Sequence, residues 1–369
     1  MWKVVSYSLL MILGIITSQV IDITSIRPVL NFLTVVILGY IMIEVGLEFT
    51  IDKGKLKSYG KDYLVAVTAA TFPWIFCSLY FWHFFDVNLS EATIIGRFAA
   101  PTSAGVIFTM LAAVGLASSW VFKKARILAI FDDLDTVLLI VPLQMIHLGF
   151  DIRAALLLLI IVFLLIIAYR YLHQWKIPTS RAWLFAYAAV LTLLSETFEK
   201  ITFINLEIIL PAFVLGCVLA NPHPPQESGH QREHDFLEPE KRFEKIWDDI
   251  LKFSYMVLVG CSLPKIVLGE TSLLFIAIHV LVLTFLANLG KIYPMFCYKK
   301  EASFHERAAL GIAMWPRGEV GAGILIISMN YAIPPIVIQL AQLSLALKLT
   351  LTGLFIYFVI WLLKKRRTS

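Results

Sequence analysis

Charged residues are scarce in this sequence: they make up 15% of its 369 positions, whereas hydrophobic residues make up 59%. A water-soluble domain of this length cannot bury so much apolar surface, so much of the chain is expected to face lipid. The composition therefore excludes an ordinary soluble enzyme or binding domain and favours a membrane protein.

Cysteine is also rare, and the nucleotide-binding glycine fingerprint is missing. The four cysteines are Cys77, Cys217, Cys261 and Cys297. They lie in or beside apolar segments and form no CxxC pair, so neither a disulfide framework nor a zinc site is indicated. We expect them to be small core residues. No cofactor is predicted, because no segment has the spacing that cradles a dinucleotide.

Apolar segments of bilayer length recur along the whole chain. A helix needs about 20 predominantly apolar residues to cross the hydrocarbon core. Such segments predict twelve helices, near residues 4–21, 29–49, 62–85, 91–115, 121–147, 153–170, 181–196, 203–220, 247–268, 271–297, 303–329 and 334–362. We therefore predict an all-α polytopic membrane protein. The first segment has no small-residue cleavage site and is expected to be a retained helix.

The short connecting segments alternate in charge. The basic ones lie near residues 53–61, 123–126, 170–181, 299–307 and 364–367. Lysine and arginine collect on the cytoplasmic side of membrane proteins, so both termini are predicted to be cytoplasmic. This arrangement also accounts for the net charge of +5 without a nucleic-acid partner.

One polar segment divides the predicted helices into two groups. Residues 1–220 hold the first eight helices, 221–246 form a predicted cytoplasmic linker, and 247–369 hold the last four. The linker contains His223, His230 and His234, but a solvated polar linker is favoured over a metal site.

Several ionisable residues fall within the apolar segments, where each costs at least ~2.5–3.5 kcal/mol. They are Glu44, Arg97, Asp132, Asp133, Asp135, Lys291, Arg317, Glu319 and Lys348. Both signs occur, so some of these groups are expected to pair. On a helix, Asp132 and Asp135 share one face while Asp133 points about 100° away. One aspartate can therefore be held in an ion pair while its neighbour faces a cavity.

The fourth and eleventh helices are interrupted by proline and glycine. Residues 96–107 read GRFAAPTSAGVI, and residues 314–324 read MWPRGEVGAGI. Such breaks free backbone groups that lipid cannot satisfy, so they are tolerated where the backbone lines an aqueous site. Two interrupted helices in opposite halves of a chain indicate a transporter built from inverted repeats, with the two broken helices crossing.

These motifs resemble the monovalent cation:proton antiporter-2 family of bacterial sodium/proton and potassium/proton antiporters. The resemblance runs from LGYIMIEVGLEF (38–49) through AIFDD and LANLGKIYP (286–294) to the PRGE motif. It implies that Asp133 binds the ion and the proton, and that Asp132 pairs with Lys291. It also implies that Thr102 and Ser103 line the crossing, and that Arg317 and Glu319 mark the second broken helix. A homodimer in the bacterial inner membrane is implied as well.

The sequence departs from that family's pattern at four positions. Asp135 is an additional acid, Arg97 and Pro101 stand where small or neutral residues are preferred, and Glu44 replaces an apolar residue. Opposite charges in lipid favour pairing, so an Asp135–Arg97 or a Glu44–Arg97 pair is predicted; the alternative is that these residues change which ion is carried. For Asp135, the rival interpretation is a protonated carboxyl that is hydrogen-bonded to backbone.

The resemblance implies secondary active exchange of a monovalent cation for protons by alternating access. Na⁺ is the first expectation, with K⁺ and Li⁺ as alternatives, and the first aspartate of the pair favours electrogenic exchange. We expect a transporter rather than an enzyme, and no metal besides the transported cation. Two other classes are the alternatives. A cation channel would need a filter of carbonyls or charged rings, and an intramembrane aspartyl protease would need a GxGD segment; the sequence shows neither.

Overall fold

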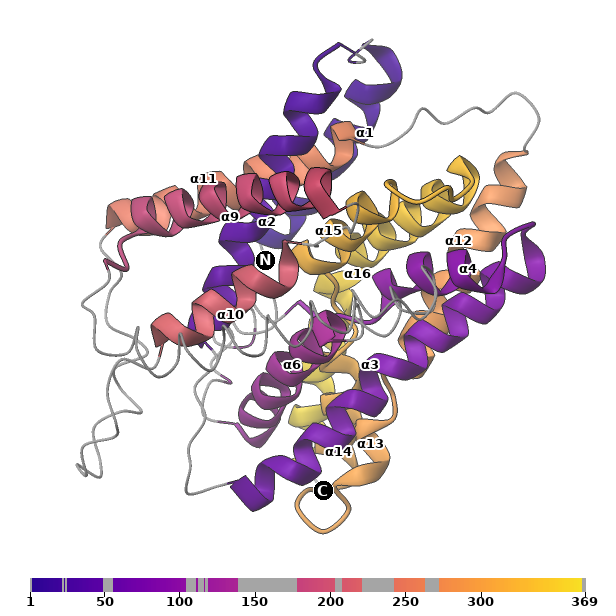
Figure 1. The fold of residues 1–369 in the computed structure, drawn as a ribbon. Coiled ribbons are helices and arrows are strands. Elements are labelled where there is room, and N and C mark those ends of the chain that lie inside the picture. Colours follow the sequence, from indigo (N-terminus) through magenta and orange to yellow (C-terminus); the bar gives the residue numbers. More distant parts are fainter. Residues whose placement is uncertain are drawn as a thin grey trace. The chain divides into compact units, whose positions relative to one another are not determined.

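The computed structural model describes residues 2–21, 23, 25–48, 56–103, 111, 116, 119–138, 178–202, 208–220, 242–262 and 272–366. Every regular element in these residues is a helix (Figure 1). The elements are α1 (Trp2–Val20), α2 (Arg27–Glu48), α3 (Leu56–Phe84), α4 (Leu89–Gly96), η2 (Arg97–Ala99), α6 (Trp120–Leu138), α9 (Arg181–Thr202), α10 (Ile209–Ala220), α11 (Arg242–Ser262), α12 (Leu273–Gly290), α13 (Pro294–Cys297), α14 (Phe304–Ala313), α15 (Glu319–Ser328) and α16 (Pro335–Arg366).

The prediction of an all-α polytopic membrane protein is confirmed. Segment 153–170 lies outside the described residues, and the described part of every other predicted segment contains a helix or part of a broken helix. Among the described residues, four spans are long and apolar enough to cross a membrane: Arg27–Leu47, Gly60–Phe84, Leu273–Cys297 and Pro335–Lys365. Residues 242–246 of the predicted linker already belong to α11, and the rest of that linker lies outside the described residues.

The chain forms two compact units. The first consists of Met1–Arg27, Asp52–Gly149 and Met256–Ser369, and the second of Pro28–Ile51 and Phe150–Tyr255. In the first unit, α3 packs against α4, α6 and α12, and α16 packs against α1, α12 and α14 (Figure 1). The helices that carry the membrane-embedded aspartates and Lys291 therefore belong to one unit.

Two glycines let helices of the first unit approach α3 closely. A Cβ atom added to Gly96 would lie 2.2 Å from Ser78 Oγ, and one added to Gly290 would lie 2.4 Å from the backbone nitrogen of Pro73. Both distances are well below van der Waals contact, so only glycine fits. Gly290 directly precedes Lys291, and this contact therefore helps to set the position of Lys291 relative to α3.

The second unit contains the ion pairs of Glu44. Its Oε2 atom lies 3.0 Å from Lys252 Nζ, and its Oε1 atom pairs with Arg181. These contacts join α2, α9 and α11. The predicted Glu44–Arg97 pair is therefore wrong, because the cations that reach Glu44 come from within its own unit.

Candidate functional site

Three carboxylates are buried on α6. The exposed fractions of Asp132, Asp133 and Asp135 are 0%, 1% and 3%. The next residue, Thr136, donates its hydroxyl hydrogen bond to the carbonyl of Asp132 at 2.8 Å, so it satisfies the backbone and not a carboxylate. The charges of the aspartates must therefore be balanced by other helices or by protons.

Lys291 supplies a counter-charge to Asp132. Its ammonium donates to Asp132 Oδ1 at 2.7 Å and to Oδ2 at 2.6 Å, and both side chains are fully buried. Lys291 is the C-cap residue of α12, where the helix dipole favours a positive charge. It also lies within electrostatic range of Asp133. The structure thus brings Lys291, Asp132 and Asp133 together, and all three side chains are buried.

The two broken helices meet at their breaks. After η2 the backbone leaves the helix at Pro101–Ser103, and between α14 and α15 it does so at 315–318. The backbone nitrogen of Ser103 donates to Pro316 O at 3.1 Å, and Thr102 Oγ1 donates to Met314 O at 3.2 Å. Backbone groups freed by one break are therefore satisfied by the other, as membrane burial requires.

Arg317 is fully buried in the second break. Its Nη1 atom donates to Met314 O at 3.2 Å and to Thr102 Oγ1 at 3.3 Å, and its Nη2 atom donates to Ala287 O at 3.4 Å. The guanidinium thus caps the negative end of α14. It is also within electrostatic range of Asp132 and Asp133, which places the crossing beside the carboxylates. Glu319 begins α15, but its side chain lies outside the described part of the structure.

The predicted Asp135–Arg97 pair is not formed. Arg97 is buried in η2, and the ion pairs between described residues include none that joins it to Asp135. Instead, the hydroxyl of Tyr63 on α3 lies within hydrogen-bonding reach of the Asp135 carboxylate. Tyr63 also packs edge-on against Phe131, with ring centroids 5.5 Å apart. This face of α6 meets α3, and a tyrosine is the side chain that α3 presents there.

Lys348 is a further buried cation, on α16. It is fully buried, and its Nζ atom has no hydrogen-bond partner among the residues the structure describes. Arg317 and Lys291 both lie within electrostatic range of it. The sequence marks Lys348 as a membrane-embedded charge but gives no sign of this neighbourhood, because the three cations come from separate segments.

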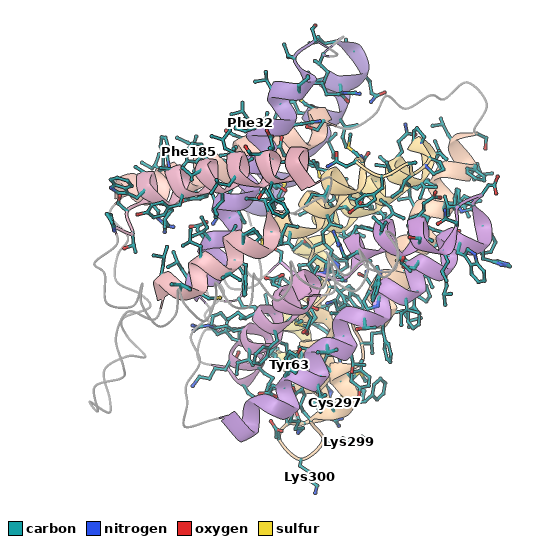
Figure 2. All side chains as sticks on the ribbon, viewed as in Figure 1. Phe32, Tyr63, Phe185, Cys297, Lys299 and Lys300 are labelled. Atoms are coloured by element: carbon teal, nitrogen blue, oxygen red, sulfur yellow. The ribbon has the colours of Figure 1, made fainter. Side chains whose placement is uncertain are left out.

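A second polar network, which sequence reasoning missed, lies at the end of the unit where α3 and α6 begin. Lys124 Nζ lies 3.0 Å from the buried Asp62 and 3.2 Å from Glu301, and Tyr298 donates to Asp62 at 2.7 Å. Lys61 pairs with Glu301 at 2.5 Å. Figure 2 shows Lys299 and Lys300 on the loop between α13 and α14. The available signal was an acid, Asp62, inside a basic segment.

Comparison with known proteins gives the chain its family. The sequence profile of the sodium/hydrogen exchanger transmembrane family matches residues 3–364. The chain belongs to the sodium/hydrogen exchanger family. It is a multi-pass membrane protein, and its function is cation/proton antiport, so the alternatives of a channel and an aspartyl protease are set aside. The monovalent cation:proton antiporter-2 group that the motifs resemble is a slightly different family within the same class of exchanger.

Solved structures show the same fold. The sodium proton antiporter MjNhaP1 from Methanocaldococcus jannaschii at pH 8 matches with a TM-score of 0.66 and 16% identity, over 96% of this exchanger and 90% of that chain. An electron microscopy map of the same antiporter matches with a TM-score of 0.53 and 16% identity, over 94% and 90% of the two chains. A direct search among curated protein sequences gave no match.

Proposed function

We propose that this exchanger moves Na⁺ against protons through one site made by Asp133, Asp132 and the crossing at Thr102 and Ser103. The observation that carries the proposal is the buried Lys291–Asp132 ion pair, which lies beside a second buried carboxylate and the two helix breaks. Asp133 is the group at which Na⁺ and a proton compete. Loading one of them requires release of the other, and this competition couples the two fluxes.

Lys291 is proposed to act as the built-in counter-charge. A buried ammonium that loses its carboxylate is left uncompensated, so Lys291 stays on Asp132 until a transported cation approaches. Arg317 holds the end of α14 and adds positive potential near the carboxylates. Because Asp132 is a second acid at the site, we propose electrogenic exchange by alternating access. K⁺ and Li⁺ remain the alternatives for the transported cation.

The proposal is tested in proteoliposomes, one cation at a time. A pH gradient is formed, and Na⁺, K⁺ or Li⁺ is added while a dye reports the internal pH. We expect Na⁺ to collapse the gradient, at a rate that changes with an imposed membrane potential. Proton movement that no monovalent cation stimulates would contradict the proposed exchange. A rate independent of potential would contradict electrogenic transport alone.

We also propose that both termini are cytoplasmic, in a bacterial inner membrane, and that the exchanger is a homodimer, as the motif resemblance implies. Lys61, Lys124 and Glu301 meet at one end of the first unit. This supports the charge-based orientation, because the sequence predicts that Lys61, Lys124 and the loop with Lys299 and Lys300 all lie on the cytoplasmic side.

A further inference from the structure

The loop between α13 and α14 carries two lysines that no acid neutralises. Lys299 and Lys300 are both exposed, and none of the ion pairs between described residues includes either of them. The acid of this loop, Glu301, is already paired with Lys61 and Lys124. Figure 2 shows Lys300 at the tip of the loop, pointing away from the helices. The loop tip therefore presents two uncompensated positive charges.

Hydrogen bonds of the loop itself brace this turn. The N–H groups of Glu301 and Ala302 donate to the carbonyl of Tyr298 at 3.0 and 3.2 Å. The guanidinium of Arg307 donates to Ala302 O at 3.2 Å and to Met295 O at 2.8 Å, so it joins the two ends of the loop. The lysines are therefore displayed on a preorganised turn, and less conformational freedom is lost when they bind a ligand.

Exposed aromatic rings flank the two lysines. Phe296 on α13 and Phe304 at the start of α14 are each 56% exposed. The apolar span Leu273–Cys297 ends directly before the loop. Basic side chains next to exposed apolar rings are typical of segments that lie at a membrane surface, with the rings at the boundary between head groups and acyl chains. We therefore expect the loop to lie at the level of the lipid head groups.

We propose that Lys299 and Lys300 bind the phosphate group of an anionic phospholipid, while Phe296 and Phe304 contact its acyl chains. The two ammonium groups complement the charge of the phosphate, and this attraction acts close to the membrane surface. The exposed rings favour a lipid over a free phosphate ion, because only the lipid has apolar surface to bury against them. This site is separate from the exchange site and does not depend on which cation is transported.

The position of the loop gives the bound lipid a structural effect. The loop connects the end of α12, which carries Lys291, to α14, which leads into the second helix break. A lipid that binds only the folded loop stabilises the folded exchanger by mass action. Anionic phospholipid should therefore raise the melting temperature of the protein.

The test is the thermal stability of the purified full-length exchanger in detergent, during titration with phosphatidylglycerol, which carries one negative charge. We expect the melting temperature to rise with added lipid. Phosphatidylcholine, which has no net charge, and inorganic phosphate should have little effect. Combining Lys299→Gln and Lys300→Gln should increase the half-maximal phosphatidylglycerol concentration by about 25-fold, because each lysine near an anionic surface contributes about fivefold.

Two double variants separate a defined site from general attraction between basic segments and anionic lipid. Lys364→Gln with Lys365→Gln removes two exposed lysines from the end of α16 and is the matched control, which should respond like the wild type. An equal loss of response in the control and in the glutamine variant of Lys299 and Lys300 would overturn the site. Lys299→Arg with Lys300→Arg keeps both charges and should keep the response.

A third double variant tests the choice of a lipid over a soluble anion. Phe296→Ser with Phe304→Ser keeps both lysines but removes the apolar contacts, so it should weaken the response to phosphatidylglycerol. An unchanged response in this variant, or equal stabilisation of the wild type by inorganic phosphate, would overturn the assignment to a lipid. Equal stabilisation by phosphatidylcholine would show that the charge of the lipid is not recognised and would overturn the role of the lysines.

Discussion

At the scale of single residues, burial decides what each charge in this exchanger can do. Asp132 and Asp133 are adjacent in sequence and equally buried, yet Lys291 contacts both carboxylate oxygens of Asp132 and is only within electrostatic range of Asp133. Adjacent positions on a helix point about 100° apart, so only one of the two can meet a given lysine head-on. The two adjacent carboxylates therefore differ in their partners: Lys291 contacts Asp132 and does not contact Asp133.

The first prediction concerns Asp133. Asp133→Asn keeps the shape and polarity of the side chain but cannot bind a cation by charge, so cation-dependent proton movement should fall to background. Thermal stability in detergent should stay close to that of the wild type. Proton movement is measured in everted vesicles with a pH-sensitive dye, and thermal stability is measured from a melting curve in detergent. Asp86→Asn, at an exposed position, is the control for both. Exchange at the wild-type rate would rule out Asp133 as the binding group.

The second prediction concerns Lys291. Lys291→Ala leaves a fully buried Asp132 without its counter-charge, and breaking a buried pair in this way typically costs about 3–5 kcal/mol. We expect a clearly lower melting temperature in detergent together with impaired transport. Lys300→Ala, on the exposed loop after α13, should melt like the wild type. If Lys291→Ala also melted like the wild type, the buried pair would not be a stabilising contact.

At the scale of elements, the site depends on helices that end or break at defined places. The end of α12 presents Lys291, and the breaks between η2 and Ser103 and between α14 and α15 satisfy each other's backbone groups. The direct packing of Gly290 against Pro73 sets the position of the C-terminal end of α12 relative to α3.

Gly290→Ala tests that contact. The added Cβ would lie 2.4 Å from Pro73 N, so α3 and α12 must separate, and Lys291 must move with the end of its helix. Overpacking of this kind typically costs about 1–3 kcal/mol, and slower exchange should accompany it. Gly353→Ala on α16 is a matched control, because no atom lies within 4 Å of its added Cβ. There, alanine should leave the melting temperature unchanged or raise it.

The network at the start of α3 and α6 gives a pH-dependent prediction. Partial burial raises the pKa of Glu301, but hydrogen bonds from Lys61 and Lys124 and their charges outweigh it, so the pKa lies below its usual value. A lowered folded-state pKa contributes stability above the unfolded-state pKa, and this stability is lost as the pH falls through the folded-state pKa. Glu301→Gln should therefore melt below wild type at neutral pH, and the difference should shrink in acid. A constant difference across pH would contradict this assignment.

At the scale of the whole molecule, the proposed orientation depends on which basic segments meet at each end of α3. The loop between α13 and α14 and the first turns of α6 carry lysines, and they meet the start of α3 at one end of the first unit. The opposite end of α3 packs against the start of α12, where Tyr80 contacts His279 at 2.6 Å. A chain that crosses the membrane repeatedly must keep these two ends on opposite sides.

Cysteine labelling tests the orientation. Lys300→Cys should react with a membrane-impermeant maleimide in everted vesicles but not in intact cells, and Asp86→Cys should show the reverse pattern. Both positions are exposed, whereas Cys77 and Cys261 are buried and Cys217 and Cys297 are partly buried. Protein without an added cysteine measures the background labelling of these four native cysteines. The opposite labelling pattern would invert the proposed orientation.

The sequence by itself determined the class, the helices and the breaks. Apolar segments of bilayer length, together with proline and glycine inside the fourth and eleventh of them, are local signals, because a helix satisfies its own backbone and a break exposes it. The role of Lys291 as partner of Asp132 came from motif resemblance, and the structure places the two in contact across 159 residues.

Only the tertiary structure decided which other charges meet. Asp135 faces Tyr63 instead of Arg97, Glu44 meets Arg181 and Lys252, and Tyr298 reaches Asp62 across 236 residues. Periodicity tells which residues share a helix face but not which helix that face meets. The choice of partner depends on how each helix is rotated about its axis and where it crosses its neighbours, and those are set by packing between distant segments.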